Sequence, residues 1–280
     1  MGKFIKTYML QVGLAVLFVL PSHIQAKMSC SKNALCIEDV DRQGKADIYA
    51  INKRYNSISG TINVSYQHMQ TNTNFPLEFH LKGQEKKLLF TLKKKTKAWG
   101  YNYKYTWVGC DTRAKHNSRY IYRLPYQKNK KFRVSQSCNG RISHFGNFKY
   151  AIDFEMPIGT PIHAAREGTV ITVKEDSNAG GFSKQYANKA NYIAIEHADG
   201  TIGEYVHLKQ DGALVRVGEK VLQGDFLGYS GNTGYTQGPH LHFGVFLSSN
   251  GKDFYSVPVK FDTARGAIQC PRENDYLRVP

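Results

Sequence analysis

Apolar and polar residues alternate along short segments of this chain, and glycines and polar loops separate the segments. Successive side chains of a β-strand point to opposite faces, so an alternation with a period of two predicts strands. The clearest case places Tyr101, Tyr103, Tyr105 and Trp107 on one face and Asn102, Lys104 and Thr106 on the other. We expect the aromatic face to pack into a sheet core, and a platform that binds sugar or peptide is the alternative.

The predicted strands fall into two groups along the chain. In the first half they span residues 47–52, 57–66, 76–81, 88–92, 101–107 and 119–124. Six short strands joined by polar loops predict a β-sandwich or barrel. In the second half they span residues 150–155, 169–173, 192–197, 203–208 and 240–246. The expected fold class is mainly β, with a sandwich-like N-terminal domain followed by a second domain of antiparallel strands.

Two further segments stand outside this pattern. Residues 176–190 contain Gly180-Gly181 and no apolar periodicity, so they predict a flap or a groove wall. Residues 257–261 predict a strand within a C-terminal extension, residues 248–280, which packs on the second domain.

The distribution of charge supports a division into two domains. The 280 residues carry a formal net charge of +16, and residues 27–134 hold 22 Lys and Arg against 7 Asp and Glu. Residues 135–280 hold 14 against 15. We therefore expect a basic domain at 27–134 and a second domain at 135–247. The lysine runs predict a solvated face or a strand edge, or attraction to anionic envelope polymers.

The start of the chain predicts export. Lys3 and Lys6 precede an apolar run over residues 9–20, and small and polar residues up to Ala26 follow it. This order is typical of a cleaved signal peptide, residues 1–26, and the run is shorter than the ~20 residues that a membrane span needs. We expect a secreted or periplasmic protein that has no membrane span after cleavage and no nucleic-acid partner.

Cysteine usage agrees with an oxidising compartment. Five cysteines follow the expected cleavage site: Cys30, Cys36, Cys110, Cys138 and Cys270. Two disulfides among five cysteines can be arranged in about 15 ways, which the sequence leaves open. No pair has CxxC spacing, so a cysteine-based zinc cluster is not expected. Cys270 is placed to link the C-terminal extension to an earlier cysteine.

Histidines and one carboxylate carry the candidate chemistry. His240 and His242 are two apart in a predicted strand, so both imidazoles point to one face. Asp153 lies in an otherwise apolar strand, where a carboxylate needs a cation or hydrogen bonds. With His144 and His207 they supply three metal ligands and two spare imidazoles, as a catalytic zinc site requires. A structural aspartate and satisfied histidines are the alternative.

Several ordered motifs carry a family resemblance. In chain order they are residues 151–161 (AIDFEMPIGTP), residues 205–208 (YVHL), residues 230–234 (SGNTG) and residues 238–243 (GPHLHF). From residue 136 to 247, the chain resembles the lysostaphin-like (LytM-type) zinc metalloendopeptidases, which cleave peptides of the bacterial cell wall. Their duplicated hybrid motif fold places the site at the floor of a groove in an antiparallel sheet.

The resemblance implies roles for individual residues. One Zn²⁺ per chain would be held by His144, Asp153 and His242. His207 and His240 would act as general base and as stabiliser of the tetrahedral intermediate, in an order that the sequence leaves open. The remaining motif positions expected to bind substrate are Tyr205, Asn232, Thr233 and Gly234. Peptidoglycan stem or cross-bridge peptides are the expected substrate.

The sequence also leaves alternatives. Many family members have the first histidine and aspartate four apart, whereas His144 and Asp153 are nine apart, and His163 and His197 compete for the first ligand position. A non-catalytic relative that binds the wall and activates another hydrolase is the alternative function. The bond that is cleaved can be a glycyl bond, a D-alanyl cross-link or a bond in an extracellular protein.

Overall fold

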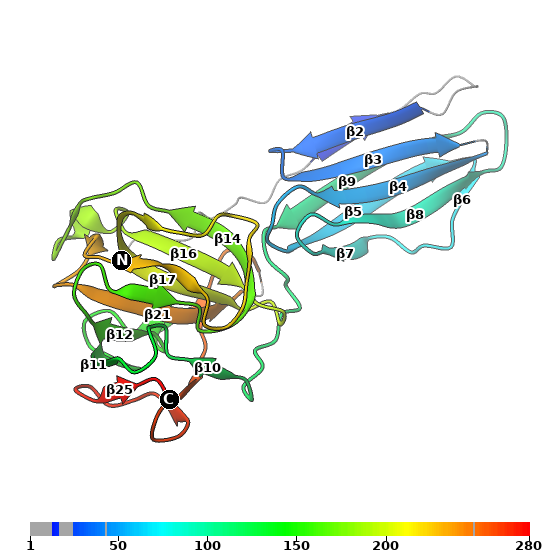
Figure 1. The fold of residues 1–280 in the computed structure, drawn as a ribbon. Helices are drawn as coiled ribbons and strands as arrows, with labels where there is room; N and C mark the ends of the chain where they lie inside the picture. The colour runs from blue at the N-terminus through cyan, green and yellow to red at the C-terminus, as the bar shows by residue number, and fades with distance from the viewer. Residues whose placement is uncertain (1–12, 17–24, 43, 249) are drawn as a thin grey trace. The chain divides into compact units, whose positions relative to one another are not determined.

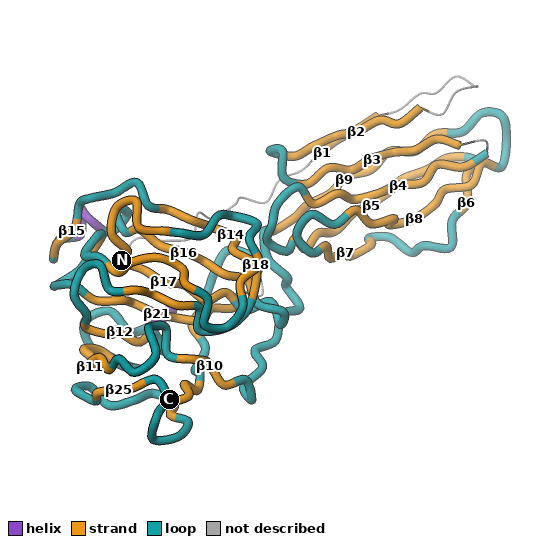
Figure 2. The backbone as a smooth tube through the Cα atoms, in the orientation of Figure 1, coloured by secondary structure: helices purple, strands orange, loops and turns teal. Residues whose placement is uncertain are grey.

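The computed structural model describes residues 13–16, 25–42, 44–248 and 250–280 (Figure 1). None of these residues lies in an α-helix, and strands joined by loops make up the fold, as Figure 2 shows. Within the same ranges, no helix has the length and apolar character needed to cross a membrane. The expected signal peptide, residues 1–26, lies mostly outside the described residues. Its described part is strand β1 (Gly13–Val16) and the first two residues of β2 (Gln25–Ser31).

The described chain divides into two compact units. The boundary lies between residues 112 and 113, whereas the sequence predicted it after residue 134. Residues 250–252 belong to the N-terminal unit, and the other residues from 113 onward form the C-terminal unit. The difference arises because β10 (Ile121–Arg123) and β11 (Lys131–Gln136) pair with strands of the C-terminal unit. Residues 27–112 hold 14 basic and 7 acidic residues, and residues 113–280 hold 22 and 15, so both segments are net basic.

The N-terminal unit contains two antiparallel sheets that share one core. One sheet has the order β1, β9 (Gly100–Val108), β5 (Ile58–Gln67) and β7 (Leu77–Leu81). The other has the order β2, β3 (Leu35–Arg42), β4 (Lys45–Asn52), β8 (Lys86–Lys94) and β6 (Met69–Gln70). All four aromatic residues of the predicted stripe on β9 are buried in this core, which confirms the sheet-core interpretation.

Two lysines of the predicted basic runs have partners within the N-terminal unit. Lys94 lies 3.1 Å from Asp41 and over the ring of Trp99, and Lys86 pairs with Glu38. Both lysines belong to β8, so they act at least in part as local charge partners along a strand.

The C-terminal unit is organised around an 11-stranded sheet. Its main path is β18 (Lys220–Val221), β14 (Gly168–Lys174), β16 (Asn191–Glu196), β17 (Ile202–Ala213), β21 (His240–Leu247), β12 (Ile152–Glu155), β11 and β25 (Tyr276–Arg278). Off this path lie β13 (Pro161–His163), β19 (Phe226–Ser230) and β22 (Tyr255–Ser256). Figure 1 shows β17, β21 and β12 side by side.

Smaller elements surround this sheet. Strand β10 pairs with β23 (Lys260–Asp262), which pairs with β24 (Ile268–Gln269). β15 (Gly180–Gly181) pairs with β20 (Gly234–Tyr235), and η1 (Gly146–Phe148) and η2 (Lys184–Tyr186) are short 3-10 turns. The strand predicted at residues 257–261 corresponds to β23, shifted toward the C-terminus because Pro258 has no N–H to donate to a ladder.

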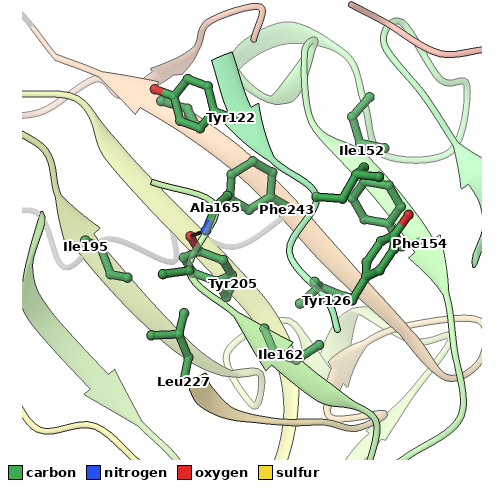
Figure 3. Packing of buried hydrophobic residues seen from close by; sticks show 14 of the residues in the cluster. Tyr122, Tyr126, Ile152, Phe154, Ile162, Ala165, Ile195, Tyr205, Leu227 and Phe243 are labelled. Atoms are coloured by element: carbon green, nitrogen blue, oxygen red, sulfur yellow. Dashed lines mark hydrogen bonds between the residues drawn. The ribbon is translucent and has the colours of Figure 1, made fainter. Parts of the chain in front are cut away.

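One face of the large sheet packs into an apolar core, shown in Figure 3. Phe243 of β21, Phe154 of β12 and Tyr205 of β17 all point into it. Because side chains alternate along a strand, the residues between them point to the opposite face. Those intervening residues are His242, Asp153, Glu155, Glu204 and Val206, and they line a groove.

Two disulfides form among the five cysteines. Cys30 and Cys36 link β2 to β3 in the N-terminal unit. Cys138 and Cys270 link the segment after β11 to the C-terminal extension, 132 residues away. Cys110, the fifth cysteine, is buried, and Ser59 donates a hydrogen bond to its backbone carbonyl.

Candidate metal centre

The register of two neighbouring strands creates the centre. Asp153 of β12 pairs directly with His242 of β21, and Glu155 pairs with His240. Directly opposite residues of an antiparallel pair point to the same face, with Cβ atoms ~4.5–5.5 Å apart. A carboxylate and two imidazoles therefore meet on the groove face.

Three donor atoms converge there. Oδ1 of Asp153 lies 2.8 Å from Nδ1 of His242 and 3.1 Å from Nε2 of His144, and the two histidine nitrogens are 3.2 Å apart. All three side chains are buried. They form the one group of potential metal-ligating residues found in the described part of the chain.

His144 reaches the centre from the loop that follows β11. It lies nine positions before Asp153, and the intervening segment turns back through η1, so the wider spacing still brings the side chains together. Nδ1 of His144 lies 2.9 Å from the backbone carbonyl of Ser137. Because a carbonyl only accepts, Nδ1 donates this hydrogen bond, and the Nε2 of the neutral ring presents its lone pair to the centre.

This arrangement fits a metal ion. Nε2 of His144 and Oδ1 of Asp153 are both acceptors, so their approach to 3.1 Å calls for a cation between them or an extra proton. Ligands of a tetrahedral zinc at ~2.0–2.2 Å lie ~3.3 Å from one another, close to the observed separations. Two imidazoles and one carboxylate are a ligand set that zinc accepts, with a fourth position left for water or substrate.

The electrostatics of Asp153 and His242 match this role. Burial raises the pKa of Asp153, but the charge of His240 and the close approach of the His144 and His242 rings outweigh it and hold that pKa well below its usual value. Burial also lowers the pKa of His242, against the opposing effect of Asp153. A carboxylate and a neutral imidazole are the forms that bind a metal.

Gln136 supports the centre from a second layer. Its side-chain nitrogen donates to Oδ2 of Asp153 at 2.8 Å and to the hydroxyl of Ser143 at 2.7 Å. Its oxygen accepts from the backbone N–H groups of Ile142 and Ser143, each at 3.0 Å. Gln136 thus fixes both the carboxylate and the loop that carries His144, as residues around metal ligands commonly do.

His207 is turned toward the centre by a β-bulge. Tyr192 pairs with Val206 and Asn191 pairs with Leu208, so His207 is an extra residue in β17, with φ of 69°. Nδ1 of His207 donates to the carbonyl of Thr233 at 2.6 Å, which leaves Nε2 as an acceptor. Burial, followed by the charges of His240 and His242, lowers the pKa of His207 well below its usual value.

His240 lies beside His207, with 4.5 Å between the ring centres. Nδ1 of His240 donates to the carbonyl of Gly238 at 2.8 Å, and Nε2 lies 3.8 Å from Oδ1 of Asp153. The structure therefore brings together all five residues that the sequence singled out for metal binding and proton transfer.

A groove of about 330 Å³ contains this centre. Phe182 and Ala187, from the loop predicted to be a flap or groove wall, line it together with Tyr235. The rings of Phe182 and Tyr235 lie 5.1 Å apart. The prediction of a wall for residues 176–190 is confirmed at these two residues.

The four residues expected to bind substrate do not line the groove. Tyr205 is fully buried on the core face, where its hydroxyl accepts from the N–H of Ala165, 2.7 Å away (Figure 3). The alternation along β17 explains this position, since Val206 takes the groove side. The expectation of direct contact is therefore not met for Tyr205 in this arrangement.

Asn232, Thr233 and Gly234 instead shape the loop that holds His207. The Thr233 hydroxyl donates to the carbonyl of Leu208 and accepts from the N–H of Asn191, while the Thr233 carbonyl accepts from His207. Oδ1 of Asn232 accepts from the hydroxyl of Thr236. Gly234 has φ of 85°, and a Cβ there would lie 2.5 Å from that of Ala190.

The two competing histidines lie elsewhere and are bonded to backbone carbonyls. Nδ1 of His163 lies 2.8 Å from the carbonyl of Gly224, and Nδ1 of His197 lies 2.8 Å from that of Glu167. Burial lowers the pKa of His197 to about 4, so this ring is neutral at physiological pH. Neither histidine belongs to the group of three potential ligands.

Sequence reasoning missed several groove residues, among them Gln136 and Glu204. Glu204 lies in the run Ile202-Gly203-Glu204-Tyr205-Val206, whose other residues are uncharged, a signal similar to the one that drew attention to Asp153. Arg133 and Glu155 also line the groove and are bonded to each other, with Nε of Arg133 2.7 Å from Oε2 of Glu155.

Comparisons with known proteins give one family model and several similar proteins. Residues 147–254 match the model of the family described as Peptidase family M23. An uncharacterized metalloprotease of Buchnera aphidicola is 41% identical over 122 residues, which are 42% of this chain and 29% of the relative. Peptidoglycan DD-endopeptidase ShyA of Vibrio cholerae is 35% identical over 126 residues, 44% of this chain and 26% of the relative.

A solved structure, the catalytic domain of the antimicrobial peptidase lysostaphin from Staphylococcus simulans, is 29% identical with a TM-score of 0.33. The match covers 46% of this chain and 88% of the lysostaphin domain. The matched region spans less than a third of the length of the two curated relatives above.

Proposed function

We propose that the chain is an exported zinc-dependent endopeptidase that hydrolyses peptide bonds of peptidoglycan, on the premise that residues 147–254 match Peptidase family M23. The observation that carries this proposal is the convergence of His144, Asp153 and His242 in a groove that two further histidines line. The similarity to ShyA, a peptidoglycan DD-endopeptidase, supports the choice of substrate.

His144, Asp153 and His242 would hold the zinc through Nε2, Oδ1 and Nδ1. When bound, zinc polarises a carbonyl as a Lewis acid and lowers the pKa of water to ~7. Gln136 keeps the carboxylate oriented, because its amide occupies Oδ2 and leaves Oδ1 for the metal.

His207 is the better candidate for general base. The hydrogen bond to Thr233 keeps the Nε2 of His207 free of hydrogen in the neutral ring, and its lowered pKa keeps the ring neutral. Nε2 can therefore accept a proton from the attacking water and pass it to the leaving amine.

His240 suits the stabilisation of negative charge. Nδ1 of His240 donates to the carbonyl of Gly238, and its Nε2 lies 3.8 Å from Oδ1 of Asp153. With both ring nitrogens protonated, His240 would donate from Nε2, and a hydrogen bond to a developing oxyanion typically contributes ~10² to 10³ in rate. His207 would thus act as the proton acceptor and His240 as the hydrogen-bond donor.

Export is supported by the two disulfides, since such bonds persist in oxidising compartments. We place the protein outside the cytoplasm, in the periplasm or secreted. The alternative function, a non-catalytic relative that activates another hydrolase, is weakened because all five metal and acid-base positions are filled.

The test compares the mature protein with three variants for zinc content and release of peptides from purified peptidoglycan. We expect about one zinc per chain and hydrolysis for the wild type. His242→Ala loses the metal, His240→Ala keeps the metal and loses turnover, and His163→Ala, outside the groove, behaves as wild type. A wild type that binds wall material but holds no zinc and cleaves nothing would show the activating relative instead.

A further inference from the structure

Glu204 is a buried carboxyl group at the floor of the groove. It lies on β17 directly opposite Gly244 of β21, and it lines the groove with only 3% of its surface exposed. The pair two positions further along these strands consists of Val206 on β17 and the metal-ligand candidate His242 on β21. Since residues two apart share a face, Glu204 sits one row from the metal centre, ~7 Å away along the strand.

This carboxyl group differs from the other acids of the groove in having no counter-charge. Among the described residues, none forms a hydrogen bond or ion pair with the carboxyl group of Glu204, whose backbone pairs with β16 and β21. Asp153 is surrounded by three histidines, and Glu155 is bonded to Arg133. Buried carboxylates are normally paired or hydrogen-bonded, so the isolation of Glu204 needs an explanation.

The surroundings of Glu204 are apolar. Gly244 carries no side chain opposite it, and a Cβ there would lie 2.7 Å from the ring of Phe246. The ring of Phe148, which also lines the groove, packs against Phe246 at 5.6 Å. Burial in this environment raises the pKa of Glu204 to about 7. A positive group brought in by a ligand would meet the one uncompensated acid in this part of the groove.

We propose that Glu204 is the specificity-determining residue of a subsite that binds an ammonium group of the peptide substrate next to the scissile bond. The inference rests on the proposed endopeptidase function and adds the chemical class of the neighbouring residue. An extended peptide rises ~3.3 Å per residue, so the ~7 Å between Glu204 and the metal centre places the amine within about two residues of the reacting carbonyl.

A carboxylate–ammonium contact explains the isolation better than a hydrogen bond to a neutral group. A buried ionised carboxylate is strongly destabilised without a counter-charge, and an amine supplies both the charge and donors. Arg133 cannot serve, because it is held by Glu155 and by Asn274 at 2.7 Å.

The experiment uses synthetic peptides that span a bond cleaved in peptidoglycan. The peptides form pairs that differ only in having lysine or Nε-acetyllysine at one position, which is one of the two residues before or the two residues after that bond. For each peptide, kcat/KM is measured with zinc-loaded protein. At one position we expect wild type to favour lysine by about tenfold or more, the range of a hydrogen bond to a charged group. Glu204→Gln should reduce this ratio to near one while keeping its zinc.

The matched control is Glu155→Gln, a second groove carboxyl that already has a partner, and it should retain the lysine ratio. Equal rates for both peptides in wild type would overturn the proposal, as would a Glu204→Gln variant that keeps the lysine preference. A variant that loses both rates equally would assign Glu204 a structural role.

A binding measurement separates this inference from the proposed function. If the wild type cleaves none of the peptides, calorimetry with the same pairs still reports whether lysine binds more tightly than acetyllysine. Amine-dependent binding that Glu204→Gln abolishes would support the subsite while the endopeptidase function fails. Cleavage without any amine dependence would support the endopeptidase function and overturn the subsite.

Discussion

Oδ1 of Asp153 lies 2.8 Å from Nδ1 of His242, although the two residues are 89 positions apart in the chain. The contact follows from the antiparallel register of β12 and β21, which sets these two residues directly opposite each other. A slip of one residue would turn one of them into the core. The geometry of the metal centre therefore depends on the register of these two strands. Packing of the apolar residues on the other face stabilises that register.

Gln136 provides a test of the second layer. Replacing Gln136 with alanine should lower zinc affinity about 10- to 100-fold, because Asp153 loses its orienting hydrogen bond and the His144 loop loses two. Competition with a chromogenic chelator measures the affinity. Gln237→Ala, another groove residue, is the control and should bind zinc as wild type does. Equal affinities for Gln136→Ala and wild type would contradict this assignment.

Thr233 is predicted to act through His207 rather than on the substrate. Thr233→Val removes two buried hydrogen bonds and loosens the loop whose carbonyl orients His207, so kcat should fall more than tenfold. KM and zinc content should change little, and unfolding should become easier by about 1–3 kcal/mol. Steady-state kinetics and denaturant titration measure both effects. A rise in KM with constant kcat would instead restore the role in substrate binding.

The pH dependence of stability isolates Glu204. Its pKa is about 7 in the folded protein against an ordinary value of 4.5, so the folded state holds the proton more tightly. Between these two values the folded state binds more protons than the unfolded state, and stability falls as pH rises. Glutamine does not titrate, so Glu204→Gln avoids this fall. The free energy of unfolding of Glu204→Gln minus that of metal-free wild type should therefore increase from pH 5 to pH 8.

Denaturant unfolding of both metal-free proteins across this range gives the difference directly. The comparison also cancels the opposite trend expected from His207 and His242, whose lowered pKa values reduce stability as pH falls. A difference that stays constant with pH would show that Glu204 titrates normally.

The disulfide between Cys138 and Cys270 should stabilise the C-terminal unit. It closes a segment of 132 residues, and removal of a native disulfide typically costs about 2–5 kcal/mol. Cys138 also follows Ser137, whose carbonyl orients His144, so Cys270→Ser should weaken zinc binding as well as lower the melting temperature. Thermal unfolding with and without zinc measures both. The Cys30→Ser/Cys36→Ser pair, in the N-terminal unit, is the control and should leave zinc affinity unchanged.

Much of the local structure was determined by the sequence alone. The alternation of residues 101–107 is enough to predict a strand with one buried aromatic face, because the two faces of a strand alternate whatever the partner strands are. The pattern HxH likewise places His240 and His242 on one face. Asp153 stands out because a carboxylate in an apolar strand requires a partner.

The boundary between the units was not readable in this way. Charge counted along the chain suggested residue 134, but strand pairing assigns residues 113–134 to the C-terminal unit. Surface charge is only weakly coupled to packing, whereas β10 and β11 are fixed by hydrogen bonds to distant strands.

The tertiary structure decided which face each motif residue occupies and what surrounds it. Tyr205 and Glu204 are neighbours in sequence, yet one fills the core and the other lines the groove, while the bulge at His207 breaks the alternation and returns that ring to the site. Local sequence specifies the period of a strand, but long-range register and packing select the buried face and the counter-charges. The sequence therefore determined the inventory of chemical groups, and the fold decided which of them meet and that Glu204 stands without a partner among the residues described.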